Sequence, residues 1–335
     1  MIERAYDIAI LPAPADRASP DNHGWVFGLP PGIRPEQWPL DPVTGYPLMH
    51  GFTLLLPEDY RCHGPEIVAV SFFATAADQN DGGARAEKDM MAAVLGDAMP
   101  VDARFRPFWR PSEARHPHLH RMTDILDYHY AVILLTQAEF DGPFCSPPVM
   151  PRDAIPMDSA QKKLGGSEDE DGNVDWVYGP VCSPPDWLAK GGARAAFEGQ
   201  GGGQGGDDAW AESLMGRPEP GLAVNRALRR TPRIGDPNAG KPPREDWAAD
   251  FVASGYQPPA YFEGDVIDAA HWREHDWAKN RPPIHIGGTM RPVQNIPDVS
   301  PYYIEFEEWF GGYNFGAGGN AQLDFKDMKF DWACG

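Results

Sequence analysis

The chain has 335 residues and a net charge of −20, with 49 carboxylates against 29 lysine and arginine residues. At roughly 100 to 200 residues per domain, this length allows one large domain or two. A hydrophobic share of 42% excludes a wholly disordered chain, while 36 glycines and 36 prolines argue against a compact helical bundle. Because nucleic-acid affinity depends on lysine and arginine, the charge disfavours nucleic acid and favours basic partners.

The N-terminal part, residues 1–150, alternates strand-like runs with turn residues. Strands are predicted at 25–29, 51–57, 66–74 and 128–136, and the apolar run in the last of these indicates burial on both faces. Apolar residues at helical spacing predict an amphipathic helix over 84–99, which Pro100 would end.

The middle of the chain, residues 151–245, has the composition of an irregular Pro/Gly-rich insertion. It contains an acidic run at 168–171 and a glycine-rich run at 199–206. Such sequence buries too little apolar area to offset a backbone entropy cost of roughly 1 to 2 kcal/mol per fixed residue. Its end carries a small basic patch, which is too small to overcome the acidic charge for nucleic-acid binding and consists of Arg226, Arg229, Arg230 and Arg233.

Order is expected to return near Trp247 in the C-terminal part, residues 246–335. Asp265 is placed to cap a helix that would end before Pro282, and a strand-rich tail follows with a glycine-rich hairpin loop at 311–319. The sequence therefore predicts one α+β domain over 1–335, made mainly of antiparallel sheet with a few helices and long Pro/Gly-rich loops.

No stretch approaches the roughly 18 consecutive apolar residues of a membrane-spanning helix. Acids at Glu3 and Asp7 occupy the place where a signal peptide carries bases. The four cysteines form no C-x-x-C pair and are too sparse for a disulfide framework. We therefore expect a cytoplasmic protein with free thiols and no membrane partner.

Two histidines and a glutamate form an H-x-x-E-H pattern at residues 271–275. On a helix, His271 and His275 at i and i+4 could hold one zinc ion with Glu274 as general base, and Glu305, Glu307 or Glu308 would be candidates for a third ligand. A zinc-dependent hydrolase is thus the alternative function; the other interpretation is a helix whose His and Glu residues face water. A second group, His116, His118, His120 and His129, is compatible with a surface loop or a structural metal.

Acidity is densest in the C-terminal part, which has 14 carboxylates against six bases. An ordered acidic face of this kind could dock a basic protein, because complementary charge raises the encounter rate and rejects wrong partners. The carboxylates expected to form that face are Glu305, Glu307, Glu308, Asp324 and Asp327.

Several segments, taken in order, resemble the YwqG-like (DUF1963) family. The matching N-terminal features are Gly28-Leu29-Pro30, Trp38-Pro39, Gly45-Tyr46-Pro47-Leu48 and the apolar run 52–57. Near the C-terminus, Gly287-Gly288-Thr289-Met290 with Gln294 is similar to a glycine-glycine element of that family, with Met290 where proline is common. The glycine-rich loop, the strand 321–325 and the ending 330–334 are similar as well, so the likeness covers about the first 75 and the last 55 residues.

The resemblance implies an α+β fold dominated by antiparallel sheet, with no established catalytic residues and no cofactor. Family members are often associated with bacterial toxin systems, some as immunity proteins beside secreted effectors such as those of type VI secretion. The expected function is accordingly an immunity protein that binds a cognate effector toxin with a basic docking face and blocks it by occlusion, without catalysis of its own.

Overall fold

In the computed structural model, the described residues are 2–45, 47–75, 88–148, 150, 225–264, 268–308, 310–313, 315–316 and 318–335. Within them, antiparallel strands dominate and helices are few and short. The strands are β1 (Ala5–Pro14), β2 (Gly24–Val26), β3 (Met49–Leu55), β4 (Ile67–Ala74), β5 (Leu119–Thr123), β6 (His129–Thr136), β7 (Arg226–Arg233), β8 (Ala260–Phe262), β9 (Trp272–Glu274), β10 (His285–Ile286), β11 (Tyr303–Glu307), β12 (Asn320–Asp324) and β13 (Lys329–Ala333). The helices are α1 (Lys88–Leu95), α2 (Gln137–Phe140) and α7 (Phe251–Ser254), with 3-10 turns η1 (Pro35–Gln37), η2 (Glu58–Tyr60), η4 (Arg106–Phe108), η5 (Ser112–Ala114) and η7 (Ala269–His271).

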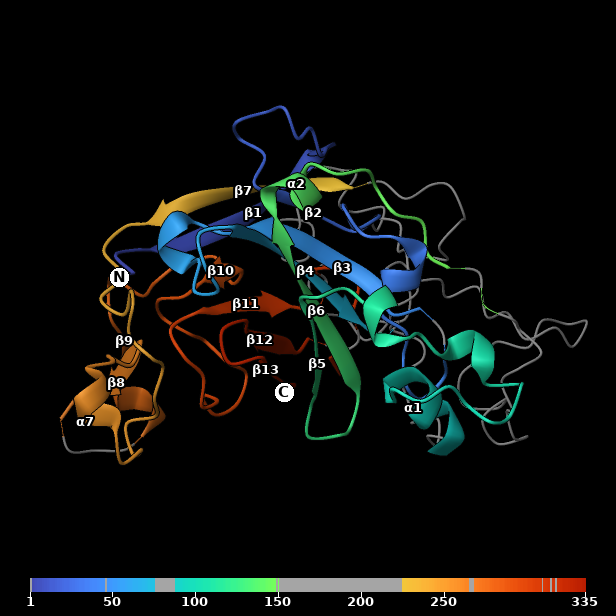
Figure 1. The fold of residues 1–335 in the computed structure, drawn as a ribbon. Helices are drawn as coiled ribbons and strands as arrows, with labels where there is room; N and C mark the ends of the chain where they lie inside the picture. The colour runs from blue at the N-terminus through green and yellow to red at the C-terminus, as the bar shows by residue number, and fades with distance from the viewer. Residues whose placement is uncertain are drawn as a thin grey trace, which may run out of the picture.

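Eleven of the described strands form one antiparallel sheet in the order β13-β12-β11-β10-β1-β7-β2-β3-β4-β6-β5. Figure 1 shows the sheet curling, so that the C-terminal strands lie beneath the N-terminal ones and the two edge strands, β5 and β13, come near each other. At this seam the Tyr130 and Phe330 rings lie 4.0 Å apart, and Trp332 donates from Nε1 to Asp124 at 2.6 Å.

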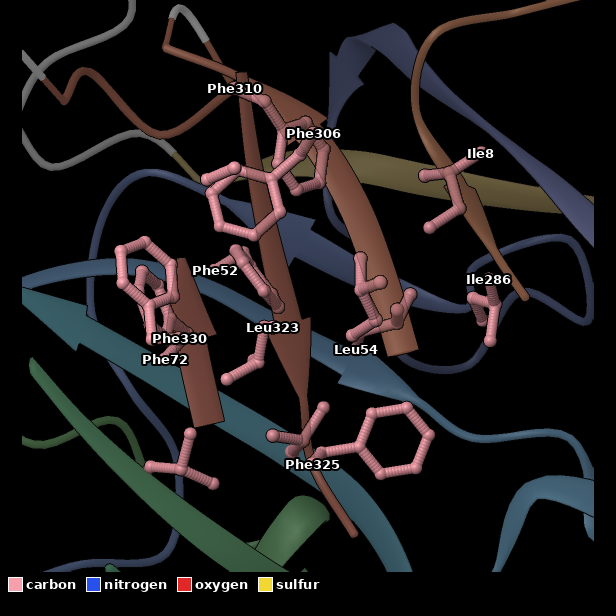
Figure 2. Close-up of a cluster of buried hydrophobic side chains, with 14 of the residues drawn as sticks. Ile8, Phe52, Leu54, Phe72, Ile286, Phe306, Phe310, Leu323, Phe325 and Phe330 are labelled. Carbon is pink, nitrogen blue, oxygen red and sulfur yellow. The ribbon is translucent and has the colours of Figure 1, made fainter. Parts of the chain in front are cut away.

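The curled sheet encloses the main apolar core. Alternate residues of each strand point inward, so that Phe52 on β3, Phe72 on β4 and Phe306 on β11 meet in one aromatic cluster (Figure 2). Phe72 stacks on Phe52 at 5.4 Å and on Phe330 of β13 at 5.2 Å. Because each buried phenylalanine contributes roughly 1.5 to 3 kcal/mol, this cluster holds the two ends of the chain in one fold.

The outer side of β3, β4 and β6 is buried as well. Phe73, Ile133 and Leu135 pack there with Trp38 and with Phe140 of α2. Residues of β4 and β6 therefore serve a core on each face, which explains their continuous apolar sequence. The predicted strands at 66–74 and 128–136 are confirmed, as are the predominance of antiparallel sheet and the hairpin joining β11 to β12.

Two expectations about the chain's organisation are wrong. Strand β7 lies within the segment predicted as an irregular insertion, 151–245, and pairs with β1 and β2 in the middle of the sheet. Its Arg233 is buried and donates to Asp7 at 2.5 Å, so part of the basic patch is an interior ion pair. The predicted helix after Asp265 is also wrong from residue 268 onward, where a 3-10 turn leads into β9. Residues 151–224 lie outside the described residues.

Candidate docking surface

A small two-stranded sheet stands apart from the large one. Within the described part of the chain, strands β8 and β9 pair only with each other, and Figure 1 shows them near α7 at one end of the molecule. Phe262 and Trp272 are cross-strand partners, which places both side chains on the same face. They are 41% and 52% exposed, respectively. We call the exposed residues at this end of the small sheet, Tyr261, Phe262, Glu263, Asp268 and Trp272, the β8–β9 surface; Tyr261 alternates with Phe262 and lies on the other face.

The local sequence favours strands here because aromatic residues suit an extended, half-exposed backbone. Pro258 and Pro259 precede β8 and oppose a helix at that point. Gly264, with φ of +77°, follows β8 and turns the chain. The exposed aromatic pair Phe262 and Trp272 was not predicted from the sequence, although aromatic residues on either side of a glycine turn were the available signal.

The charge around this sheet is strongly acidic. From residue 245 to residue 277 the only base is Arg273, which pairs with Glu263 at 3.0 Å. The same segment has eight carboxylates: Glu245, Asp246, Asp250, Glu263, Asp265, Asp268, Glu274 and Asp276. Four of these carboxylates, Asp250, Glu263, Glu274 and Asp276, pair with a lysine or arginine, and the segment stays net negative. An exposed apolar pair in a net negative segment suits a partner that is apolar at its centre and basic around it.

Polar contacts hold this unit against the large sheet. The Arg291 guanidinium binds the Glu274 carboxylate and the Ala278 carbonyl. The Tyr256 hydroxyl, whose pKa is raised by burial, accepts a hydrogen bond from the Met290 backbone at 2.9 Å. Arg291 and Met290 directly follow the Gly287-Gly288-Thr289 turn, so the segment that resembles the glycine-glycine element positions the small sheet.

The H-x-x-E-H residues lie in this unit, but not on a helix. His271 ends η7, Glu274 ends β9, and His275 follows it. The His275 ring stacks between Tyr261, at 4.7 Å, and Trp277, at 5.2 Å. The i and i+4 geometry on which the zinc alternative rested is therefore wrong, because the backbone is extended across the motif.

Among the described residues, no group of three or more His, Cys, Asp or Glu side chains is arranged to hold a metal ion. In the second histidine group, His116 contacts Glu139 at 3.0 Å and lies beside His118. Glu139 also closes the N-terminal cap of α2 through Thr136, so this contact has a structural role.

Three of the five carboxylates predicted to form an acidic docking face are buried. Glu305 is 1% exposed, Glu308 3% and Asp324 0%. Glu307 is half-buried and Asp327 is exposed. The expectation of an accessible face built from all five is wrong, because segment 287–301 packs on Glu305 and Asp324 and the glycine-rich turn closes on Glu308.

The buried carboxylates hold backbone in place. Glu308 accepts hydrogen bonds from Phe315 at 3.1 Å and Gly318 at 2.6 Å, which closes the glycine-rich turn. Asp324 accepts from the Ser300 backbone at 2.6 Å and its hydroxyl at 2.9 Å, and from Lys326 at 3.0 Å. For each of these buried carboxylates, hydrogen bonds from nearby protein donors take the place of the hydrogen bonds to water that burial removes.

Glu305 and His285 form a buried pair whose Oε2 and Nε2 atoms lie 3.5 Å apart. The carboxylate also accepts from the Arg291 backbone at 3.0 Å. Burial raises the pKa of Glu305 to about 8, and burial, followed by the charge of Arg233, lowers the pKa of His285 to about 3. His285 donates from Nδ1 to the Gly287 carbonyl at 2.8 Å, leaving Nε2 as an acceptor. Burial thus favours the neutral form of both groups and opposes an ion pair between them.

Comparison of the chain with protein-family models, with curated proteins and with solved structures finds no match in any of the three. In the part of the chain that the structure describes, no helix is both long and apolar enough to cross a membrane.

Proposed function

We propose that this protein acts by binding another protein through the β8–β9 surface, as an immunity protein that blocks a bacterial effector toxin by occlusion. The observation that carries the proposal is the exposed pair Phe262 and Trp272, set in a segment with eight carboxylates and one arginine. The toxin as partner class comes from the family resemblance; the acidic aromatic surface supports a basic partner.

Exposed aromatic pairs of this kind suit a protein interface. Large aromatic side chains supply much of the binding energy in protein complexes when a partner covers them. Negative charge around them would accelerate encounter with a basic surface and would be sensitive to salt. We therefore propose Phe262, Glu263, Asp268 and Trp272 as the partner-binding residues. They replace the five carboxylates predicted from the sequence, three of which are buried.

Other parts of the sequence interpretation remain predictions within this proposal. They are the α+β class with long Pro/Gly-rich loops, the single domain over 1–335, the cytoplasmic location, and action without catalysis or a cofactor. The zinc-dependent hydrolase also stays a prediction, and the extended backbone at His271–His275 offers it no support.

The test screens the reading frames that adjoin this protein's gene for one whose product is toxic when expressed. We expect the full chain to bind that toxin and to restore growth of cells that express it. Replacing both Phe262 and Trp272 with alanine should weaken binding at least 100-fold, since each buried aromatic anchor contributes roughly 2 kcal/mol or more. Calorimetry and growth rescue measure the two effects.

The matched control replaces Ile125 and Leu126 with alanine. These residues are also exposed and apolar, but they lie in the turn between β5 and β6. Binding should be unchanged in this control. The proposal is wrong if the full chain fails to bind the toxin, or if the control and the Phe262/Trp272 variant behave alike.

A further inference from the structure

The outer edge of β8 has backbone groups that pair with no strand among the described residues. Glu263 donates to the His271 carbonyl at 2.8 Å and His275 donates to the Pro259 carbonyl at 3.0 Å. Hydrogen-bonded and non-hydrogen-bonded pairs alternate along an antiparallel ladder, so Tyr261 is the β8 residue whose backbone faces β9. The N–H and C=O groups of Ala260 and Phe262 face away from it.

Neither Ala260 nor Phe262 has a backbone hydrogen-bond partner on that outer side among the residues that the structure describes. Phe262 is exposed and Ala260 half-buried, so water reaches this edge. An unpaired strand edge is a template for another strand. A sheet of two three-residue strands is also only marginally stable alone, and a third strand would stabilise it.

We propose that β8 receives an extended, basic segment of the partner as a third strand of the small sheet. The inference rests on the proposed docking function and specifies how docking occurs. Backbone hydrogen bonds to Ala260 and Phe262 would supply affinity, while alternate apolar side chains would pack on Phe262 and Trp272. Lysine or arginine residues of the segment would lie near Glu263 and Asp268, which are exposed.

Charge distinguishes this partner from other extended segments. Glu263 and Asp268 are exposed near the end of β8 in a net negative segment, so an acidic strand would meet like charge there. Like-charge juxtaposition is the usual means by which an interface rejects wrong partners. A basic strand would both pair with the backbone of β8 and carry the charge opposite to that of Glu263 and Asp268.

The probe is a capped eight-residue peptide of alternating valine and lysine. We expect it to bind the full chain and to slow amide hydrogen exchange at Ala260 and Phe262. Ala260→Pro removes one outward N–H and should raise the dissociation constant about fivefold to tenfold, the effect of one net hydrogen bond. Ala260→Val keeps the donor and should bind as the unaltered protein does.

Two further peptides keep the test independent of any distortion by proline. One carries N-methyl groups on alternate amides and cannot pair along one edge; the other has glutamate in place of lysine. Both should lose binding to the unaltered protein. The inference is overturned if the valine-lysine peptide does not bind, if either altered peptide binds equally well, or if Ala260→Pro has no effect.

Failure of this inference is separable from failure of the proposed function. If the toxin binds through Phe262 and Trp272 and Ala260→Pro leaves its affinity unchanged, docking is real but does not add a strand. If the toxin does not bind the full chain, the proposed function itself is wrong.

Discussion

The Glu305 carboxyl shows how one buried group couples stability to pH. Burial raises its pKa from 4.5 to about 8, so the folded protein holds this proton more tightly than the unfolded chain does. The contribution of this proton to stability is complete below pH 4.5 and is lost as the pH rises through about 8. At about 1.36 kcal/mol per pKa unit, the difference between 4.5 and about 8 corresponds to a loss of unfolding free energy of at most about 5 kcal/mol.

We therefore expect Glu305→Gln to flatten the fall in unfolding free energy between pH 5 and pH 9. Glutamine keeps an oxygen that can accept from the Arg291 backbone and cannot ionise. Urea unfolding at several pH values measures the effect. Glu113→Gln, at an exposed position in η5, is the control and should leave the pH dependence of the unfolding free energy as it is. If the unfolding free energy of Glu305→Gln and of the unaltered protein depends on pH in the same way, the raised pKa of Glu305 is not the source of the fall.

At the scale of elements, Arg291 is the principal side-chain link between the small sheet and the segment that covers β11. It reaches both Glu274 and the Ala278 carbonyl from a partly buried position. Arg291→Met should accelerate amide exchange at Tyr261 and Arg273 by roughly tenfold or more, because charge-assisted hydrogen bonds contribute about 1.5 to 3 kcal/mol. Hydrogen exchange read by mass spectrometry checks this.

The control for that experiment is Arg273→Met. Arg273 pairs with Glu263 within the small sheet itself, and both side chains are largely exposed. Exposed ion pairs contribute at most about 1 kcal/mol, so exchange should change by less than about fivefold. If the two variants accelerate exchange equally, Arg291 does not anchor the small sheet.

The strands that could be predicted from the sequence are those whose apolar pattern fits only one kind of structure. The continuous apolar run of β6 indicated burial on both faces, and both faces are buried; the run of β4 predicted a strand, which is confirmed. In β11, Ile304 and Phe306 lie in the core, but the sequence could not show that segment 287–301 covers Glu305 on the other side. Strand β7, which carries four arginines, was missed because its burial comes from its neighbours β1 and β2.

The candidate site was less predictable than the fold for a related reason. The residues of the H-x-x-E-H pattern fit a helix face by spacing alone, but the pairing of Phe262 with Trp272 fixes the backbone as extended. Pairing between strands ten residues apart is a tertiary choice that local propensity does not specify. Net acidity in the C-terminal part was visible in the sequence; which carboxylates reach solvent was not.

At the scale of the whole molecule, the curled sheet depends on how its two edges meet. The Asp124 carboxylate accepts from the Tyr130 hydroxyl at 2.9 Å and from Trp332 Nε1 at 2.6 Å, so it joins the β5–β6 hairpin to β13. Edge strands left open are sites of unwanted pairing. A contact that closes the seam thus serves both stability and solution behaviour.

Asp124→Ala should destabilise the protein by about 2 to 4 kcal/mol, because it leaves the Tyr130 hydroxyl and the Trp332 N–H buried without their acceptor. Trp332→Phe removes one of these donors and keeps an aromatic ring. If Asp124 and Trp332 act through their mutual contact, the double variant should lose at least 0.5 kcal/mol less than the two single losses added together. Urea unfolding of the four proteins gives that coupling, with Ile125→Ala in the same turn as an exposed control expected to stay within about 0.5 kcal/mol. If the losses of the two single variants add up to that of the double variant, the Asp124–Trp332 contact does not stabilise the seam. The edges of the sheet would then be held by apolar packing between Tyr130 and Phe330, and Asp124 would stabilise only the turn at Leu126 and Tyr128, whose backbone N–H groups donate to it.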